Sequence, residues 1–363
     1  MLRIEMLPAR HGDSIWIEYG TASNPRRILI DGGPAFSYSG LRERIKQVPE
    51  GKRNLDLLVV THIDADHIEG IIKLLGDSEV KLKIDDLWYN GHKQLTAAEN
   101  MSFGALQGEY LAALIEAREL PWNKMFDGGP VVIAKDDAEL PTYDLPDGCR
   151  LTILSPTPIQ TKKLRDRWEV ELAEAGLEPD SPEEAMARLK KSKLQPDMDF
   201  GAEEFSVEKL AAKPFKEDST VANGSSIAFL LEYQNKRCLL VGDAHPGVLE
   251  NSINKLIRKE GGTKLKIDLF KLPHHGSKHN LSPSLLKLLD CQHFLVSSDG
   301  GYFNHPDPEA IARVVAPAGG QPKVMFNYLS ERNEMWNDKE LMAQHGYQAM
   351  FPPRDKPGML IEI

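Results

Sequence analysis

The residues most able to do chemistry lie in one short stretch. His62, Asp64, Asp66 and His67 place two histidines and two aspartates within six positions. The apolar run at 57–60 is typical of a buried strand, and the apolar spacing of 68–75 predicts a helix. Such groups, crowded at a strand end, would repel or desolvate one another unless cations compensated them. Imidazole with carboxylate suits Zn²⁺, Mn²⁺ or iron, so the stretch predicts a metal site, although either aspartate alone could be an ordinary helix N-cap.

The composition narrows the class of protein. With 363 residues, 41% apolar and 27% charged, the chain is typical of a soluble globular protein. No apolar run approaches the roughly 18 residues of a membrane helix, and the first residues predict a strand rather than a signal peptide, so we expect a cytoplasmic protein without membrane contact. The scattered Cys149, Cys238 and Cys291 fit neither a disulfide framework nor a zinc motif. A net charge of −10 does not indicate a broad nucleic-acid surface, but it is compatible with a nuclease whose metals neutralise the phosphate locally.

The pattern His-x-Asp-x-Asp-His at 62–67 resembles the signature of the metallo-β-lactamase superfamily, which is usually His-x-His-x-Asp-His. Asp64 stands where the second histidine normally is. This variant is similar to the hydrolase domain of ComEC-type competence proteins and to related phosphorylcholine esterases. Two turns, His-Gly-Asp-Ser at 11–14 and Asp-Gly-Gly at 31–33, resemble the opening strands of that branch. Asp31 could orient a metal-bound histidine, although both segments are also compatible with plain β-turns.

The same resemblance identifies further candidates in the second half of the chain. Gly-Asp after the strand at 238–241 resembles the motif whose carboxylate, here Asp243, bridges two metals. The His-His-Gly-Ser run at 274–277 resembles the ligand motif that follows, and we favour His274 over His275 as the metal ligand. Asn223 lies in a turn that takes the place of the usual third histidine, and it could bind metal or simply form the turn. His305 could donate to a phosphate oxygen or to the leaving group, or could belong to the turn before a helix at 309–316.

The resemblance covers residues 1–90 and about 220–320, and it implies an α+β fold: an αββα metallo-β-lactamase sandwich with a helical insertion. We expect one domain over 1–363, with the charged segment 158–220 inserted between its halves. That segment, with predicted helices at 162–175 and 182–191, could carry substrate selectivity, bind a protein partner or act as a spacer. The remaining patterns predict further elements: strands within 3–33 and at 131–133, 151–154, 227–231, 267–272 and 358–363, and helices at 38–50 and 92–121.

The resemblance implies a hydrolase with two divalent metal ions, zinc or manganese. A metal-bound hydroxide would attack the substrate, and phosphodiester hydrolysis of DNA, RNA or a nucleotide is the leading function. Hydrolysis of a small-molecule ester, thioester, lactone or lactam is an alternative, and a partner-regulated accessory component is another. The implied metal ligands are His62, Asp64 and Asn223 for the first ion, Asp66, His67 and one of His274 and His275 for the second, and Asp243 between them. The implied catalytic residues are Asp66, His275 and His305.

Overall fold

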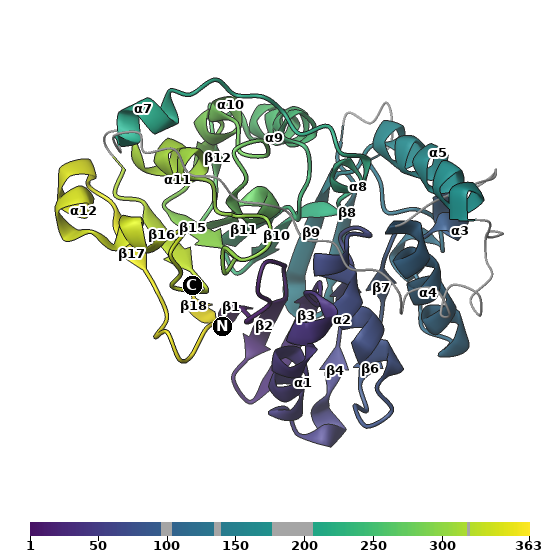
Figure 1. Ribbon diagram of the computed structural model, residues 1–363. Helices are drawn as coiled ribbons and strands as arrows, with labels where there is room; N and C mark the ends of the chain where they lie inside the picture. The colour runs from purple at the N-terminus through teal and green to yellow at the C-terminus, as the bar shows by residue number, and fades with distance from the viewer. Residues whose placement is uncertain (96–103, 134–138, 176–205, 318–319) are drawn as a thin grey trace.

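The computed structural model describes residues 1–95, 104–133, 139–175, 206–317 and 320–363. Two β-sheets pack face to face, and helices cover their outer faces, as Figure 1 shows. The predicted αββα arrangement of an α+β protein is therefore confirmed. Within the described ranges, no helix has the length and apolarity needed to cross a membrane.

The first sheet has six strands in the order β18-β1-β2-β3-β5-β7. Apolar residues alternate between its faces: Ile28 and Ile30 join the core between the sheets, whereas Leu29 packs against the helices. The C-terminal strand pairs antiparallel with β1, so the two ends of the chain lie side by side. The strands are β1 (Leu2–Met6), β2 (Ile15–Thr21), β3 (Asn24–Ile30), β5 (Leu57–Val59), β7 (Leu87–Trp88) and β18 (Met359–Glu362).

The second sheet has eight strands in the order β17-β16-β15-β13-β11-β10-β9-β8. Five of them, from β11 to β17, run parallel, so their carboxyl ends meet at one edge of the sheet. The strands are β8 (Thr142–Leu145), β9 (Cys149–Ser155), β10 (Ala228–Tyr233), β11 (Lys236–Leu240), β13 (Leu269–Lys271), β15 (His293–Val296), β16 (Lys323–Phe326) and β17 (Gln348–Met350). Two short parallel pairs lie outside the large sheets: β4 (Asn54–Leu55) with β6 (Lys83–Ile84), and β12 (Leu265–Lys266) with β14 (Leu289–Asp290).

The helices form the outer layers. The first sheet is covered by α1 (Tyr38–Lys46), α2 (Ala65–Gly76), α4 (Gly104–Ala117) and α5 (Pro158–Ala175). The second sheet is covered by α9 (Pro246–Glu260), α10 (Pro283–Lys287) and α11 (Pro308–Val315), and α12 (Lys339–His345) lies near β17. The shorter helices are α3 (His92–Leu95), α7 (Val207–Ala211) and α8 (Val221–Gly224).

Most sequence-predicted elements form, but the strand expected at 131–133 does not. Val131 and Ile133 are buried as an apolar pattern requires, yet their backbone N–H groups donate to the Asn90 side chain and to the Pro156 carbonyl instead of to a strand. The periodicity therefore identified burial correctly and secondary structure wrongly. The helix expected over 92–121 forms as α3 and α4, and residues 96–103 between them lie outside the described residues.

The described ends of the segment 158–220 are parts of the packed domain. Leu164 and Trp168 of α5 are buried beside α4, and Trp168 donates to Glu109 Oε1 at 3.3 Å. At the other end, Val207 of α7 is buried in the main core. The helix predicted at 182–191 lies outside the described residues. The single domain with an insertion at 158–220 stays a prediction.

A contact between two glycines fixes the position of α2 relative to the end of β3. The backbone N–H of Gly70 donates to the Gly33 carbonyl, and that of Gly32 donates to the His67 carbonyl. A Cβ added at Gly70 would lie 1.9 Å from the Gly32 carbonyl oxygen. Only glycine permits this approach, which holds the N-terminal turn of α2 against the loop that carries Asp31.

Gly70→Ala is expected to lower the free energy of unfolding by about 2 kcal/mol or more, because overpacking against backbone forces the helix away from the turn. Gly76→Ala in the same helix is the matched control, since its added Cβ meets no atom within 4 Å. Alanine favours a helix by up to about 1 kcal/mol, so the control should be at least as stable as the parent. Urea denaturation followed by circular dichroism measures both, and equal stability of the two variants would contradict the contact.

Candidate metal centre

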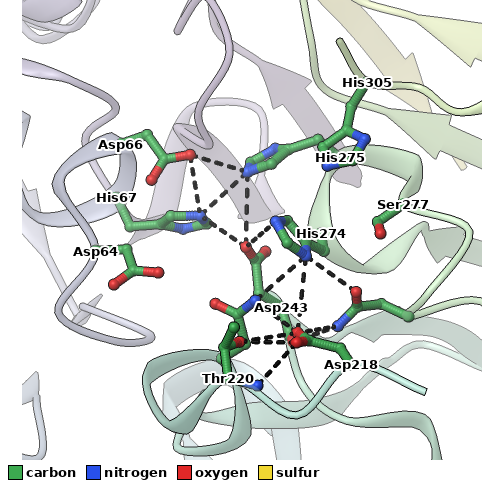
Figure 2. Close-up of polar contacts among 12 residues, drawn as sticks. Asp64, Asp66, His67, Asp218, Thr220, Asp243, His274, His275, Ser277 and His305 are labelled. Atoms are coloured by element: carbon green, nitrogen blue, oxygen red, sulfur yellow. Dashed lines mark hydrogen bonds and ion pairs between the residues drawn. The ribbon is translucent and has the colours of Figure 1, made fainter. Parts of the chain in front are cut away.

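The candidate site lies where strands of both sheets end. Asp31 follows β3, and His62 comes three residues after β5, just before α2. From the second sheet, Asp243 follows β11, the pair His274 and His275 follows β13, and Ser297 follows β15. The fold therefore brings groups far apart in the chain to one edge of the sandwich. Figure 2 shows the side chains of Asp243, His274 and His275 turned toward one another, with His67 facing them.

Four imidazoles converge on one carboxylate oxygen. Three of the histidines are fully buried, and His274 is partly exposed. Asp243 itself is 2% exposed. The distances from Asp243 Oδ2 to the Nε2 atoms are 3.8 Å for His62, 3.4 Å for His67, 3.7 Å for His274 and 3.7 Å for His275. Imidazole nitrogens gathered around one buried carboxylate are a donor set that could hold a divalent metal ion.

Hydrogen bonds fix the tautomers of the two histidines of the first sheet. His67 Nδ1 lies 2.8 Å from Asp31 Oδ2, a carboxylate that can only accept a hydrogen bond. The Thr61 hydroxyl donates to the same oxygen at 2.7 Å, which leaves the hydroxyl oxygen as the acceptor for His62 Nδ1 at 3.0 Å. Both rings therefore carry a proton on Nδ1 and turn Nε2 toward Asp243, which leaves Nε2 as the atom that a cation would take.

The histidine pair is oriented in the same way. His275 Nδ1 donates to the Ser297 carbonyl at 3.0 Å. His274 Nδ1 lies 3.0 Å from Asn280 Oδ1, and the amide group of Asn280 is assigned by its two donations, to Asp218 Oδ2 and to the Asp243 carbonyl. All four imidazoles thus turn Nε2 to one place, and a cation bound there would replace any proton on those atoms.

An unusual backbone lets two adjacent histidines face the same carboxylate. In a strand, neighbouring side chains point to opposite faces. Here His274 and His275 both have left-handed backbone angles, with φ values of 45° and 54°, and Gly276 follows with a φ of 86°. Such conformations cost about 1–3 kcal/mol each in a non-glycine residue and cluster at functional sites.

Two further carboxylates complete the cluster. Asp66 Oδ2 lies 3.3 Å from His275 Nε2 and 3.9 Å from His67 Nε2. Asp64 Oδ2 lies 3.5 Å from His62 Nε2. Asp64 occupies the N-cap position of α2, yet its side chain makes no capping hydrogen bond. Its carboxylate is turned to the histidine instead.

Three buried donor atoms of the cluster lack a hydrogen-bond partner within the described part of the chain, and a cation could take that place. Among the described residues, His62 Nε2, Asp243 Oδ1 and Asn223 Oδ1 are buried without a hydrogen-bond partner. A buried polar atom left without a partner costs about 1–3 kcal/mol, and a divalent cation would satisfy all three. Asn223 otherwise donates to Asp218 Oδ2 at 2.7 Å. The residues present therefore fit divalent metal ions.

The charges of the cluster depend on one another. Burial alone would raise the pKa of Asp243, but His67 and its neighbours lower that pKa well below its usual range. Burial alone would lower the pKa of His275, but Asp243 and Asp13 raise it to about 9. Protons on the histidines thus compensate the carboxylates, and a bound cation would displace those protons.

His305 lies beside the cluster rather than within it. Its ring centroid is 5.0 Å from that of His274, and Figure 2 shows it beyond the histidine pair. Burial first, and then His274 and His275, hold its pKa well below the usual value, so the ring is neutral. Its Nδ1 is buried without a hydrogen-bond partner among the described residues. The turn it belongs to also introduces α11, as the alternative interpretation predicted.

Sequence reasoning predicted that Asp31 could support a histidine of the cluster, but it missed other supporting residues. Asp218 accepts hydrogen bonds from the side chains of Asn223 and Asn280, and thereby holds the amide that faces His274. Lys271 in β13 is fully buried and pairs with Asp13, whose Oδ1 is 3.3 Å from His275 Nδ1. A lysine inside an apolar strand was a signal for such a pair, since buried lysines almost always have one.

A family model and two curated relatives match parts of this chain. A family model described as the metallo-beta-lactamase superfamily matches residues 8–158, which include the histidines and aspartates of 62–67. Ribonuclease Z of Alkaliphilus oremlandii (strain OhILAs) is 30% identical over 90 residues, 25% of this chain and 26% of that protein. ComE operon protein 3 of Bacillus subtilis (strain 168) is 33% identical over 94 residues, 22% of this chain and 11% of that protein. The chain thus spans about a quarter of the first relative and about a tenth of the second.

Solved structures of similar shape are distant in sequence. CmlA, a diiron β-hydroxylase from Streptomyces venezuelae, is 10% identical with a TM-score of 0.40, covering 100% of this chain and 54% of that one. The metallo-beta-lactamase fold protein YhfI from Bacillus subtilis is 10% identical with a TM-score of 0.38, covering 99% of each chain.

Lys271→Met is expected to lower the free energy of unfolding by about 3–5 kcal/mol, because it leaves the Asp13 carboxylate buried without its partner. Lys278→Met is the matched control: its side chain is 39% exposed and its Nζ lies 3.8 Å from Asp307 Oδ1, so a change within about 0.5 kcal/mol is expected. Combining Lys271→Met with Asp13→Leu should restore much of the loss. Urea denaturation measures the stability of the two single variants and of the double variant. If Lys271→Met is as stable as Lys278→Met, the pair of Lys271 and Asp13 does not stabilise the fold.

Proposed function

We propose that this chain, a member of the metallo-β-lactamase superfamily, is a metal-dependent phosphodiesterase. It would hold two divalent cations where strands of its two sheets end. The observation that supports this most is the convergence of four histidine Nε2 atoms on Asp243 Oδ2. A single cation would not use so many donors, whereas two cations that share one carboxylate would.

We assign the donors to two positions around Asp243. His67, His275 and Asp66 form one group of mutually close donor atoms, all buried. His62 and Asp64 face each other on the other side, and His274 turns its Nε2 to the same carboxylate. Asn223 Oδ1 is a further donor for this position. The sequence favoured His274 over His275, whereas the geometry favours one histidine for each cation.

When bound, the two cations supply Lewis acidity and an activated water at neutral pH. The chain's own groups position them: Asp31 fixes the ring of His67, and the Ser297 carbonyl fixes that of His275. His305, neutral and next to His274, can donate one hydrogen bond to a substrate oxygen or to the leaving group. The site thus combines a place for the charged reacting group with a separate donor.

A phosphodiester is the substrate class that we favour over an uncharged ester or lactam. One matched relative is Ribonuclease Z, which supports this choice over 90 residues of the chain. Asp64 in place of a histidine also makes the site harder and more anionic, which shifts its preference toward Mn²⁺ relative to an all-histidine site. We therefore expect activity with Mn²⁺ or Zn²⁺.

Metal-stripped protein refilled with Mn²⁺ or Zn²⁺ is expected to hydrolyse bis-p-nitrophenyl phosphate, and EDTA should abolish the activity. Asp66→Ala should lower kcat/KM roughly 100-fold or more, because it removes a carboxylate that contacts the cluster. Asp144→Ala, an exposed aspartate paired with Arg150, is the control and should keep full activity. Absence of hydrolysis in protein with two cations bound would reject the phosphodiesterase proposal in favour of a lactone or lactam substrate.

Metal content tests the assignment of the histidine pair. The parent protein is expected to bind two equivalents of Zn²⁺ after dialysis, and His274→Ala and His275→Ala should each bind about one, because each removes a donor from a different position. His345→Ala, near Glu208 and outside the cluster, should keep both. Mass spectrometry measures the number of zinc ions bound by each variant. If His274→Ala or His275→Ala keeps two equivalents, the histidine that it lacks is not a ligand.

A further inference from the structure

Four rings gather beside the candidate metal centre, and we call them the aromatic platform: His11, Phe36, Tyr302 and Phe303. The ring centroid of His11 lies 5.7 Å from Phe36, 5.2 Å from Tyr302 and 5.5 Å from Phe303. His11 and Tyr302 stack with planes 29° apart, and Phe303 meets Tyr302 edge-on. These are favourable aromatic geometries, so the rings support one another as a unit.

The two phenylalanines of the platform are exposed to solvent. Phe36 is 66% exposed and Phe303 is 43% exposed, and they are the most exposed phenylalanines in the part of the chain that the structure describes. Leaving two large apolar rings in water around one histidine costs free energy that packing inside the fold would recover. A gathering of exposed apolar side chains of this kind is typical of a binding surface.

The platform is built on the same loops as the metal centre. The loop after β1 carries His11 and, two residues on, Asp13, which pairs with Lys271. The loop after β3 carries both Asp31 and Phe36. A ligand on the platform is therefore held by the same backbone that orients the metal-binding histidines.

The loop after β15 also joins the aromatic platform to the metal centre, and the ring of His305 lies between them. Ser297, which fixes His275, begins the loop that carries Tyr302 and Phe303. The centroid of His305 lies 6.4 Å from that of Phe303 and 5.0 Å from that of His274. The platform thus begins one ring away from a proposed metal ligand.

We propose that the aromatic platform stacks the nucleobase of a substrate whose phosphodiester group lies at the metal centre. This proposal rests on the proposed function and names its substrate class: a nucleotide ester or the end of a single strand. A nucleotide carries its base one sugar away from its phosphate, which suits a platform separated from the cluster by His305. Every base has a flat π-face, and stacking on aromatic side chains is the usual way in which proteins hold unpaired bases.

The shape and charge of the surroundings favour this occupant over others. The exposed faces of Phe36 and Phe303 form an open surface, whereas a quaternary ammonium group is held in a closed aromatic cage. Arg10, beside His11, lies 3.6 Å from Asp299, so its charge is partly compensated. With a net charge of −10, the chain is suited to one or two nucleotides at the site rather than to a long backbone.

The test compares two esters that release the same product. p-Nitrophenyl thymidine 5′-phosphate carries a base, and methyl p-nitrophenyl phosphate does not. The double variant Phe36→Leu with Phe303→Leu keeps apolar side chains and removes the rings. It should raise KM for the thymidine ester about 5- to 100-fold, and it should leave kcat/KM for the methyl ester unchanged, because stacking acts on the base alone. Replacing both residues with tyrosine should restore the parent KM.

The control variant is Leu360→Ala, which truncates another exposed apolar side chain, one on β18, and it should change neither ester's kinetics. Equal effects of the leucine variant on both esters, or no effect on either, would overturn the platform. Ring-dependent preference for p-nitrophenyl phosphorylcholine over the thymidine ester would also overturn it, in favour of a cationic ligand.

A binding measurement separates failure of the platform from failure of the proposed function. Fluorescence anisotropy in EDTA follows binding of fluorescein-labelled oligothymidylate and of labelled thymidine monophosphate. The leucine variant should weaken binding about 5-fold or more. Weakening for both probes identifies the single nucleotide as the ligand, and weakening for the oligonucleotide alone identifies a strand end. If the parent protein hydrolyses neither ester, the phosphodiesterase proposal fails, and ring-dependent binding still tests the platform. Binding that does not depend on the rings overturns it.

Discussion

One buried carboxylate determines the arrangement of the site. Asp243 is 2% exposed and has four imidazole nitrogens within 3.8 Å of one oxygen. A buried charge is tolerated only when opposite charges and hydrogen bonds surround it. Two of those imidazoles, from His62 and His67, come with the first sheet, and the others come with the second. The compensation of one charge therefore joins the two sheets at the edge where the proposed metal centre lies.

The surrounding contacts make that junction rigid. The Gly32–Gly70 contact holds α2 against the loop of Asp31, which fixes both Thr61 and His67. On the opposite side, Lys271 and Asp13 join β13 to the first loop of the chain. A metal site keeps its affinity when its ligands are held by such partners, because the ligands do not have to be ordered on binding. The cost of two left-handed histidines is carried by the same framework.

The sequence predicted the part of the site that is local and missed the part that is not. His62 to His67 lie within six positions and form a recognisable pattern. The Gly-Asp and His-His-Gly-Ser patterns each follow a strand closely. Lys271 and Asp13 are 258 positions apart, and Asn280 meets Asp218 across 62 positions, so no pattern links them. The sequence favoured one histidine of the pair, whereas His274 and His275 both face Asp243, because their left-handed backbone angles are not encoded by any periodicity. The strand expected at 131–133 failed because burial and pairing are separate properties.

The acidic composition and the proposed substrate are compatible because attraction is confined to the centre. A protein of net charge −10 repels a polyanion at a distance, and salt screens that repulsion beyond about 8–10 Å. Within that distance, cations at the cluster would reverse the local sign, and apolar rings beside them do not depend on charge. The proposed recognition through a cation pair and exposed rings would favour substrates with a single accessible phosphate and an unpaired base. It disfavours duplexes, whose bases are stacked within the helix and whose binding requires an extended basic surface.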